Sequence, residues 1–311
     1  MGRAAERLGW KVDVAPVSDG GEGFVDAVGG ANRSRRVTGP LGRAVECRWR
    51  WADDEEAFIE MAAASGLALA GGPECNDALS ASTRGTGETI AAAVAAGARR
   101  VVVGLGGSAS TDGGLGCYEV LASQARRFDT ELVGACDVMV PFGAALDFAA
   151  QKGASPAEIK LLETRLERVA QIYETECGVD VRGLPGAGAA GGLGGALAAL
   201  GGRLVPGIEV VADALRLDER IAAADLVVTG EGLLDHHTFD GKGVGWIVQR
   251  ATERAVPVLV VVGDQELERL PDRLSGGDVE VVSLIARCGR ERAWSNTLGC
   301  IEAVVDERLR R

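Results

Sequence analysis

Short apolar runs alternate with amphipathic stretches along most of the chain. Runs rich in valine, isoleucine and leucine predict strands at residues 12–17, 45–51, 57–61, 101–103, 131–137, 208–211, 226–229, 258–262 and 280–284. Apolar positions at helical spacing predict helices at residues 3–10, 24–28, 89–96, 155–178, 193–200, 217–224, 244–254 and 295–311. Because buried strands joined by helices form parallel sheets, the pattern predicts an α/β protein.

Composition and charge narrow the class of protein. The chain has 311 residues, enough for two domains, and a formal net charge of −12. We expect neither a nucleic acid nor an anionic membrane as partner, because each would need a basic face. No apolar run reaches the ~20 residues that a membrane-spanning helix needs. Seven cysteines without a CxxC pair, and two histidines, argue against a zinc site and predict reduced thiols in a cytoplasmic protein.

The stretch from Arg99 to Cys117, RRVVVGLGGSASTDGGLGC, joins a buried strand to a loop rich in glycine and hydroxyl groups. Glycines let backbone N–H groups approach a ligand, and hydroxyls with an aspartate supply directional polar contacts. The residues of interest are Gly106, Gly107, Ser108, Thr111 and Asp112. This composition predicts a loop that handles a phosphate or a cofactor.

The same stretch fits a dinucleotide fingerprint, because GLGGSA at 104–109 matches GxGxxA after a strand. The fingerprint also requires an acidic residue ending a second strand about 20 residues later. Asp129 has roughly that position but follows no buried strand, and the GxGxxG at 186–191 follows a proline. An NAD(P)-dependent oxidoreductase is therefore the least favoured function. No GxxxxGK[ST] occurs, which excludes a P-loop enzyme.

Two further glycine-rich segments have a structural and a functional interpretation each. SDGGEG, at 18–23, follows a predicted strand, and its Asp19 and Glu22 could hold Mg²⁺ directly or through water. A glycine-rich turn with a helix cap explains the same residues. TRGTGE, at 83–88, precedes the helix predicted at 89–96, and a helix N-terminus after glycine can bind an anion. Capping by a threonine explains that segment equally well.

A second ligand-binding edge is predicted in the C-terminal part of the chain. The strand at 226–229 leads into Gly230-Glu231-Gly232, and the strand at 258–262 ends at Gly263. Because parallel strands end at the same edge of a sheet, Thr229, Glu231 and Asp235 are expected to lie near that glycine.

The chain resembles the bacterial glycerate kinase family, of the type that makes 2-phosphoglycerate. The blocks that carry the resemblance come in the family's order and reach to about residue 262. They are SDGGEG (18–23), VTGPLG (37–42), FIEMAAASGL (58–67), TRGTGE (83–88), GLGGSASTDGGLG (104–116), ACDV (135–138), QKGAS (151–155), GAGAAGGLGGAL (186–197), DLVVTGEGLLD (225–235) and Gly241-Lys242. So many ordered blocks are far more specific than any single glycine motif.

The resemblance implies an α/β fold with two domains. A Rossmann-like parallel-sheet domain would comprise residues 1–20 and 207–311, and a second, glycine-rich α/β domain, 21–206, would be inserted into it. It also implies ATP and Mg²⁺, with a small hydroxy acid, glycerate, bound between the domains. A homodimer is possible.

The implied reaction is direct phosphoryl transfer from ATP to a hydroxyl of D-glycerate, which needs positioning and charge neutralisation more than covalent chemistry. On that model Asp112 or Asp235 would orient or deprotonate the hydroxyl, and Lys242 would meet phosphate charge. The candidate metal ligands are Asp19, Glu22 and Glu231. The candidate substrate- or ATP-binding residues are Gly85, Thr86, Gly87, Glu88, Gly106, Gly107, Ser108, Thr111 and Gly230.

Departures from the family pattern motivate an alternative function. Family members begin with a strand that ends in an Asp-Ser-Phe-Lys-like loop, and this chain is expected to start after that segment. The segment 140–143, Val-Pro-Phe-Gly, stands where a longer Asn-Pro loop is expected. Leu233 and the pair His236-His237 replace the more usual arginine and polar pair around Asp235. The alternative is a catalytically altered or inactive relative that keeps the fold and binds a ligand.

Overall fold

The computed structural model describes residues 1–122, 129–239, 243–266, 271 and 278–310. Its contacts separate two compact units. The central unit is Val17–Val211, and the terminal unit is Met1–Pro16 together with Ala212–Arg311. These limits lie a few residues from the domain boundaries expected at 20/21 and 206/207. The division of the chain into domains at those two points stays a prediction.

A six-stranded sheet forms the middle of the central unit, in the order β1-β2-β3-β4-β5-β6. Its strands are β1 (Arg33–Thr38), β2 (Ala44–Ala52), β3 (Glu56–Glu60), β4 (Arg100–Leu105), β5 (Glu131–Cys136) and β6 (Arg203–Pro206). The hairpin β1–β2 and the pair β2–β3 are antiparallel, whereas β3 to β6 run parallel. The parallel strands therefore end at one edge, and the loops that follow them meet there.

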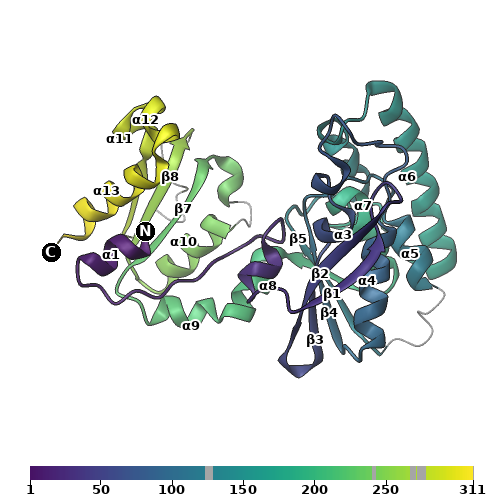
Figure 1. Ribbon diagram of the computed structural model, residues 1–311, viewed down its shortest axis with the longest axis horizontal. Helices are drawn as coiled ribbons and strands as arrows, with labels where there is room; N and C mark the ends of the chain where they lie inside the picture. Colours follow the sequence, from purple (N-terminus) through teal and green to yellow (C-terminus); the bar gives the residue numbers. More distant parts are fainter. Residues whose placement is uncertain (123–128, 240–242, 267–270, 272–277, 311) are drawn as a thin grey trace. The chain divides into compact units, whose positions relative to one another are not determined.

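Helices cover both faces of this sheet. They are α2 (Phe24–Ala27), α3 (Ala62–Ser65), α4 (Arg84–Ala95), α5 (Leu115–Ala122), α6 (Pro156–Cys177), α7 (Ala189–Ala199) and α8 (Gly207–Leu215), the last of which contains the boundary between the units. Figure 1 shows α4, α5 and α6 together on one side of the sheet. Alternation along the strands explains this arrangement: Val101 and Val103 of β4 join the core under these helices. Phe58 of β3 instead contacts Phe24 of α2, with ring centroids 6.0 Å apart.

The long helix α6 follows its sequence signals closely. Ser155 Oγ accepts a hydrogen bond from the backbone N–H of Glu158, and the Glu158 carboxylate accepts one from the backbone of Ser155, which is a capping box. Gly178 ends the helix in the left-handed conformation, at φ 72°.

The glycine-alanine run around α7 packs closely against the 106–114 loop. Ala190, Gly191 and Gly192 have left-handed backbone angles inside this element. A Cβ at Gly191 would lie 2.0 Å from the carbonyl oxygen of Ser110, so only glycine allows the run to approach the 106–114 loop this closely.

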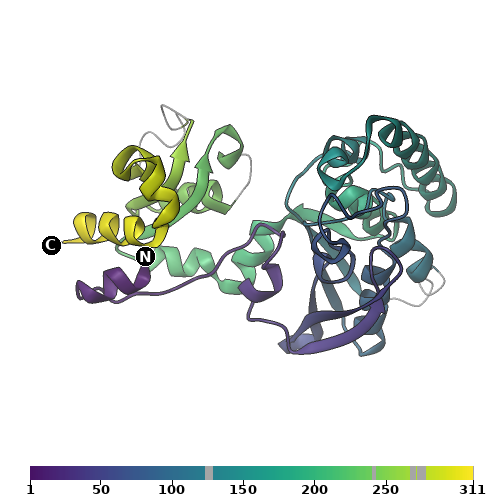
Figure 2. The same cartoon turned by 45° about the horizontal axis from the view of Figure 1, so that its top comes forward.

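A three-stranded parallel sheet forms the terminal unit, in the order β7-β8-β9. Its strands are β7 (Val227–Leu234), β8 (Val258–Gln265) and β9 (Val279–Ser283), and its helices are α1 (Gly2–Arg7), α9 (Leu217–Ala222), α10 (Gly243–Glu253), α11 (Leu284–Cys288), α12 (Arg290–Ser295) and α13 (Thr297–Leu309). On β8, Leu259 and Val261 pack toward α1 and α13, which lie side by side in Figures 1 and 2. Val260 and Val262 pack on the other face with α10. The α/β fold class and the parallel sheet are confirmed.

Several predictions of local structure were wrong. Residues 12–17 form no strand, because Val14 is exposed and Pro16 lacks an N–H for a ladder. Residues 208–211 belong to helix α8, since a short apolar run does not by itself separate a helix from a strand. Helix α4 begins at Arg84 rather than Thr89. Strand β7 runs on to Leu234, so Gly230 and Glu231 lie within it rather than in a loop.

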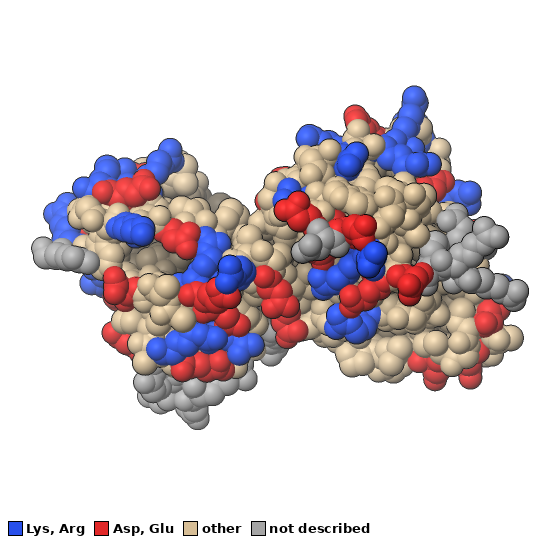
Figure 3. Space-filling view, turned by 90° about the horizontal axis from the view of Figure 1, so that it is seen from below, with Lys and Arg blue, Asp and Glu red and all other residues tan. Residues whose placement is uncertain are grey.

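The surface carries charges of both signs. Figure 3 shows lysine and arginine side chains interspersed with aspartate and glutamate on the face drawn. Arg182, for example, forms ion pairs with Glu167, Glu174 and Asp180. Within the described residues, no helix has the length and apolarity to cross a membrane. All seven cysteines are free.

Candidate functional site

Two glycine-rich loops pack against each other at the edge where the parallel strands of the central unit end. The loop 18–23 precedes α2, and the loop 106–114 follows β4. A Cβ at Gly106 would lie 2.5 Å from Gly21 Cα and 3.0 Å from Asp137 Oδ2. Only a glycine permits this approach. We call these two loops, with Asp137 and Lys152, the loop cluster.

Lys152 is the buried cation of the loop cluster, with 7% of its surface exposed. Its Nζ donates hydrogen bonds to Ser108 Oγ and to the carbonyl oxygen of Ser110, both at 2.7 Å. Burial lowers the pKa of this lysine to about 8, while the negative charges of Asp112 and Asp137 act in the opposite direction. The ammonium is therefore held against the loop by neutral oxygens.

Two features fix the backbone that carries Lys152. Asn76 Nδ2 donates to the carbonyl oxygens of Ala109, at 3.0 Å, and Lys152, at 2.8 Å, and so ties the two segments together. Gly153 has φ +92°, and a Cβ there would lie 2.2 Å from the carbonyl oxygen of Pro73. The lysine is thus placed by packing on both sides.

Several buried polar atoms of this region have no hydrogen-bond partner in the described chain. They are Ser110 Oγ, Thr111 Oγ1, Asn76 Oδ1 and Asp137 Oδ1. Ser110 and Thr111 are 0% and 1% exposed. Because buried polar groups are nearly always paired, a concentration of unpaired ones at strand ends indicates a ligand site.

Asp137 follows the end of β5, and its side chain is half-buried. Burial, first, and the nearby negative charge of Asp19, second, raise the pKa of this carboxyl to about 6. Glu22 lies at the same edge, because a Cβ at Gly107 would be 3.1 Å from its Oε1. The structure thus brings Asp19, Glu22 and Asp137 to the loop cluster.

Asp112 has a different environment from Asp137. Its Oδ2 accepts hydrogen bonds from the backbone N and Oγ1 of Thr83, both at 2.9 Å, and from Gly116 N at 3.3 Å. Its Oδ1 accepts from Gly114 N at 3.0 Å. The carboxylate therefore joins the start of α4 to the start of α5. A catalytic role for Asp112 stays a prediction.

In the TRGTGE segment, Thr83 is the N-cap of α4 and Arg84 to Glu88 form its first turns, which contact neighbouring elements closely. A Cβ at Gly85 would lie 2.0 Å from the carbonyl oxygen of Thr38, and one at Gly87 would lie 2.8 Å from Cys117 Cα. Thr86 Oγ1 and Ser65 Oγ are hydrogen-bonded at 2.9 Å.

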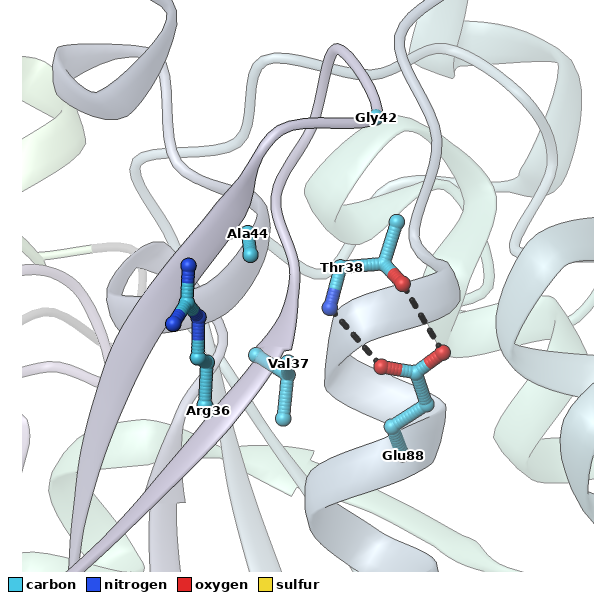
Figure 4. Close-up of a pocket in the computed structure, with 6 residues that line it drawn as sticks. All are labelled: Arg36, Val37, Thr38, Gly42, Ala44 and Glu88. Carbon is cyan, nitrogen blue, oxygen red and sulfur yellow. Dashed lines mark hydrogen bonds between the residues drawn. The ribbon is translucent and has the colours of Figure 1, made fainter.

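Glu88, the last residue of that segment, is fixed to strand β1. Its carboxylate accepts hydrogen bonds from Thr38 N at 2.8 Å and from Thr38 Oγ1 at 3.0 Å, beside a shallow hollow that Arg36 also lines (Figure 4). Arg84 Nε donates to the same carboxylate at 3.1 Å. Ligand binding by Gly85, Thr86, Gly87 and Glu88 stays a prediction.

The terminal unit brings two more of the predicted residues together. Thr238 Oγ1 donates to Glu231 Oε1 at 2.8 Å, and Thr238 N donates to Asp235 Oδ1 at 3.1 Å. Gly230 pairs with Val261 of β8, and a Cβ there would lie 1.9 Å from the carbonyl oxygen of that valine. Lys242, the predicted phosphate-binding lysine, lies outside the described residues.

Comparison with known proteins identifies the family. The model described as the glycerate kinase family matches residues 2–130 and 120–307. The protein of Escherichia coli K12 named glycerate 2-kinase is 40% identical over 286 residues, which cover 80% of this chain and 75% of its own. The chain belongs to the glycerate kinase family.

Other similar proteins extend the match. An uncharacterised protein of Mycobacterium bovis is 41% identical over 304 residues, 94% of this chain and 80% of that protein. A crystal structure from Salmonella typhimurium LT2, which carries the provisional name glycerate kinase 2, superposes with a TM-score of 0.76 at 33% identity, over 99% of this chain and 91% of that one. The family expected from the sequence is confirmed, and with it the enzyme class, since glycerate kinases are phosphotransferases.

In this member of the glycerate kinase family, the sequence did not point to two residues of the loop cluster, Lys152 and Asp137, or to Asn76, which holds the backbone of Lys152 in place. Lys152 lies in the QKGAS block and Asp137 in the ACDV block, but neither block indicates a role for them, and Asn76 has no motif around it. Two signals were present. Lysine is rare in this arginine-rich chain, and this one is followed by Gly-Ala-Ser. Asp137 ends a buried strand of a parallel sheet, where ligands bind.

Proposed function

We propose that the chain phosphorylates D-glycerate with ATP, gives 2-phosphoglycerate and uses Mg²⁺. The family and the named glycerate kinases among its relatives support the substrate and the reaction class. ATP, the metal ion and the position of phosphorylation are the parts that the proposal adds. The cytoplasmic location and the homodimer expected from the sequence stay predictions.

The unpaired carboxylate oxygen of Asp137 is the observation that supports the proposal most directly. Its carboxyl lies at the ends of the parallel strands, and its buried Oδ1 has no partner in the described chain. Such an oxygen is suited to accept a hydrogen bond from a substrate hydroxyl. Asp112, by contrast, already accepts four hydrogen bonds from the protein. We therefore assign the orientation of the attacking hydroxyl to Asp137.

The chemistry is a single displacement at phosphorus. The hydroxyl oxygen of glycerate forms a bond to the γ-phosphorus of ATP, the bond between that phosphorus and the β,γ-bridging oxygen breaks, and ADP leaves. The hydroxyl proton passes to Asp137. The backbone N–H groups of Gly106 and Gly107 would supply donors to the phosphates.

The loop cluster is suited to a magnesium ion that arrives with phosphates. Among the described residues, no group of three His, Cys, Asp or Glu is arranged to hold a metal ion. Mg²⁺ commonly takes only one or two carboxylates from the protein and completes its octahedron with phosphate oxygens and water. Asp19 and Glu22 lie at one edge of the cluster and would supply such carboxylates. The ion would neutralise charge on the transferred phosphoryl group.

The proposed function is tested with the purified chain, Mg-ATP and D-glycerate. Addition of enolase without a phosphoglycerate mutase consumes 2-phosphoglycerate only, so it identifies the product. Asp137→Asn is expected to lower kcat by a factor of about 10² or more. The control Asp147→Asn changes an exposed carboxylate of the same unit and should retain activity. If the wild-type chain binds glycerate but forms no phosphoglycerate, it is the inactive ligand-binding relative instead.

A further inference from the structure

Lys152 is a buried cation without a direct counter-ion among the described residues. Its two hydrogen-bond partners, Ser108 Oγ and the Ser110 carbonyl oxygen, are neutral. An ammonium has three donors, and the charged groups that act on it, Asp112 and Asp137, are not hydrogen-bonded to it. Because burying an unpaired charge is costly, such a lysine is retained where an anion completes the pairing.

The loop that holds this cation also carries two buried hydroxyl groups without a hydrogen-bond partner among the described residues. Ser110, whose carbonyl oxygen accepts from Lys152, has a fully buried Oγ without a partner in the described chain. The Oγ1 of the next residue, Thr111, is also buried and has no partner in the described chain. Hydroxyls can donate to an anion, and two of them on the loop that holds an ammonium suit one small, singly charged group.

The chemistry of the neighbouring residue selects the kind of anion. Asp137 lies in the same cluster, and its negative charge acts on Lys152. A cation, hydroxyl donors and a carboxylate acceptor in one cluster match a molecule that carries an acid and a hydroxyl on adjacent carbons. A phosphate chain of ATP offers no hydroxyl donor to the Asp137 carboxylate.

We propose that Lys152, with the hydroxyls of Ser110 and Thr111, binds the carboxylate of the 2-hydroxy acid substrate. This assignment rests on the proposed function for the identity of that acid. It makes Lys152 the residue by which the enzyme distinguishes a hydroxy acid from a neutral polyol.

The test compares a charged and a neutral ligand of the same shape, D-glycerate and D-glyceramide, on the full chain without ATP. Wild type should bind glycerate on the order of 100-fold more tightly than glyceramide, as expected for a buried charge pair. Lys152→Met should bind the two equally. A purely structural role would weaken both ligands by the same factor. The matched control is Lys160→Met, which removes an exposed lysine of α6 and should keep the wild-type preference.

Steady-state kinetics then show whether Lys152 binds glycerate or ATP. For Lys152→Met the KM for glycerate should rise on the order of 100-fold, and the KM for ATP should change less than about twofold. A raised KM for ATP with unchanged glycerate binding would assign the lysine to phosphate and overturn the proposal. If Lys152→Met fails to fold, the wild-type preference decides alone: equal affinity for glycerate and glyceramide overturns the assignment.

The two proposals fail separately. A wild-type chain that makes no phosphoglycerate but binds glycerate through Lys152 contradicts the proposed function and supports the carboxylate site. If wild type phosphorylates glycerate and Lys152→Met has an unchanged KM for glycerate, the proposed function is supported and the carboxylate site is contradicted.

Discussion

Asp112 holds Thr83 by two hydrogen bonds, one from the backbone N and one from Oγ1, each 2.9 Å long. The same Thr83 Oγ1 accepts from the backbone N of Cys117 at 3.0 Å. Residues that are distant in sequence thus meet at the start of α4 and α5 through one buried carboxylate. This relationship distinguishes Asp112, which is fully paired, from Asp137, which is not.

The two aspartates should respond differently to the same substitution. Asp112→Asn places an amide where several donors converge, so the free energy of unfolding should fall by about 2–3 kcal/mol. Asp137→Asn removes a poorly paired, half-buried charge and should leave stability equal or higher, while kcat falls by about 10² or more. Urea unfolding and initial rates of the two variants measure both effects. Equal loss of stability in both variants would contradict the distinction.

Lys152 should make stability depend on pH in a defined window. Its pKa is about 8 in the folded chain, against an ordinary value of 10.5, so between these values the unfolded state binds more protons and wild-type stability rises with pH. Below pH 8 the buried ammonium costs on the order of 3 kcal/mol, and this cost disappears toward pH 10.5. Asp112 and Asp137 are the charged groups that oppose the shift.

The comparison of wild type with Lys152→Met isolates this contribution. The unfolding free energy of wild type should increase relative to that of Lys152→Met as pH rises from about 8 to 10.5. Chemical denaturation at several pH values measures it, and Lys160→Met should show a flat difference. A difference that moves in favour of the variant over this window would mean that burial does not lower the pKa of Lys152.

Gly191 should be needed for both the fold and the site. Gly191→Ala places a methyl 2.0 Å from the Ser110 carbonyl oxygen at a residue with φ +68°, so stability should fall by about 2–4 kcal/mol and glycerate binding should weaken. Gly143→Ala is the matched control, since nothing lies within 4 Å of its Cβ position. Thermal unfolding and glycerate affinity are the measurements. An alanine that is tolerated at 191 as well as at 143 would show that the close approach is not required.

Glu88 should act mainly in stability. Its carboxylate is hydrogen-bonded to Thr38 and Arg84, so Glu88→Ala should cost about 1–2 kcal/mol and leave both KM values within about twofold. Glu46→Ala, at an exposed position of β2, is the control and should change neither. A large rise in the KM for ATP without loss of stability would instead support the ligand-binding role expected from the sequence.

Secondary structure was predictable where the local signal was strong. The capping box and Gly178 set both ends of α6, and the VTGPLG turn joins β1 to β2. The prediction failed at residues 12–17 and 208–211, where a short apolar pattern was the only signal. Such a pattern fits a strand, a helix or an extended segment until a neighbouring strand or core is present to select one.

The sequence by itself determined the α/β class, the family and the loops at the strand ends, because these follow from periodicity and from ordered glycine motifs. Only the tertiary structure decided which polar residues in those loops are already paired. Asp112 and Asp137 are chemically alike in sequence, yet one meets donors from Thr83, Gly114 and Gly116, and the other meets none for its Oδ1 within the described chain. Lys152 became a candidate only through its burial against Ser108 and Ser110, since the cost of a buried charge depends on partners that chain folding brings from distant positions.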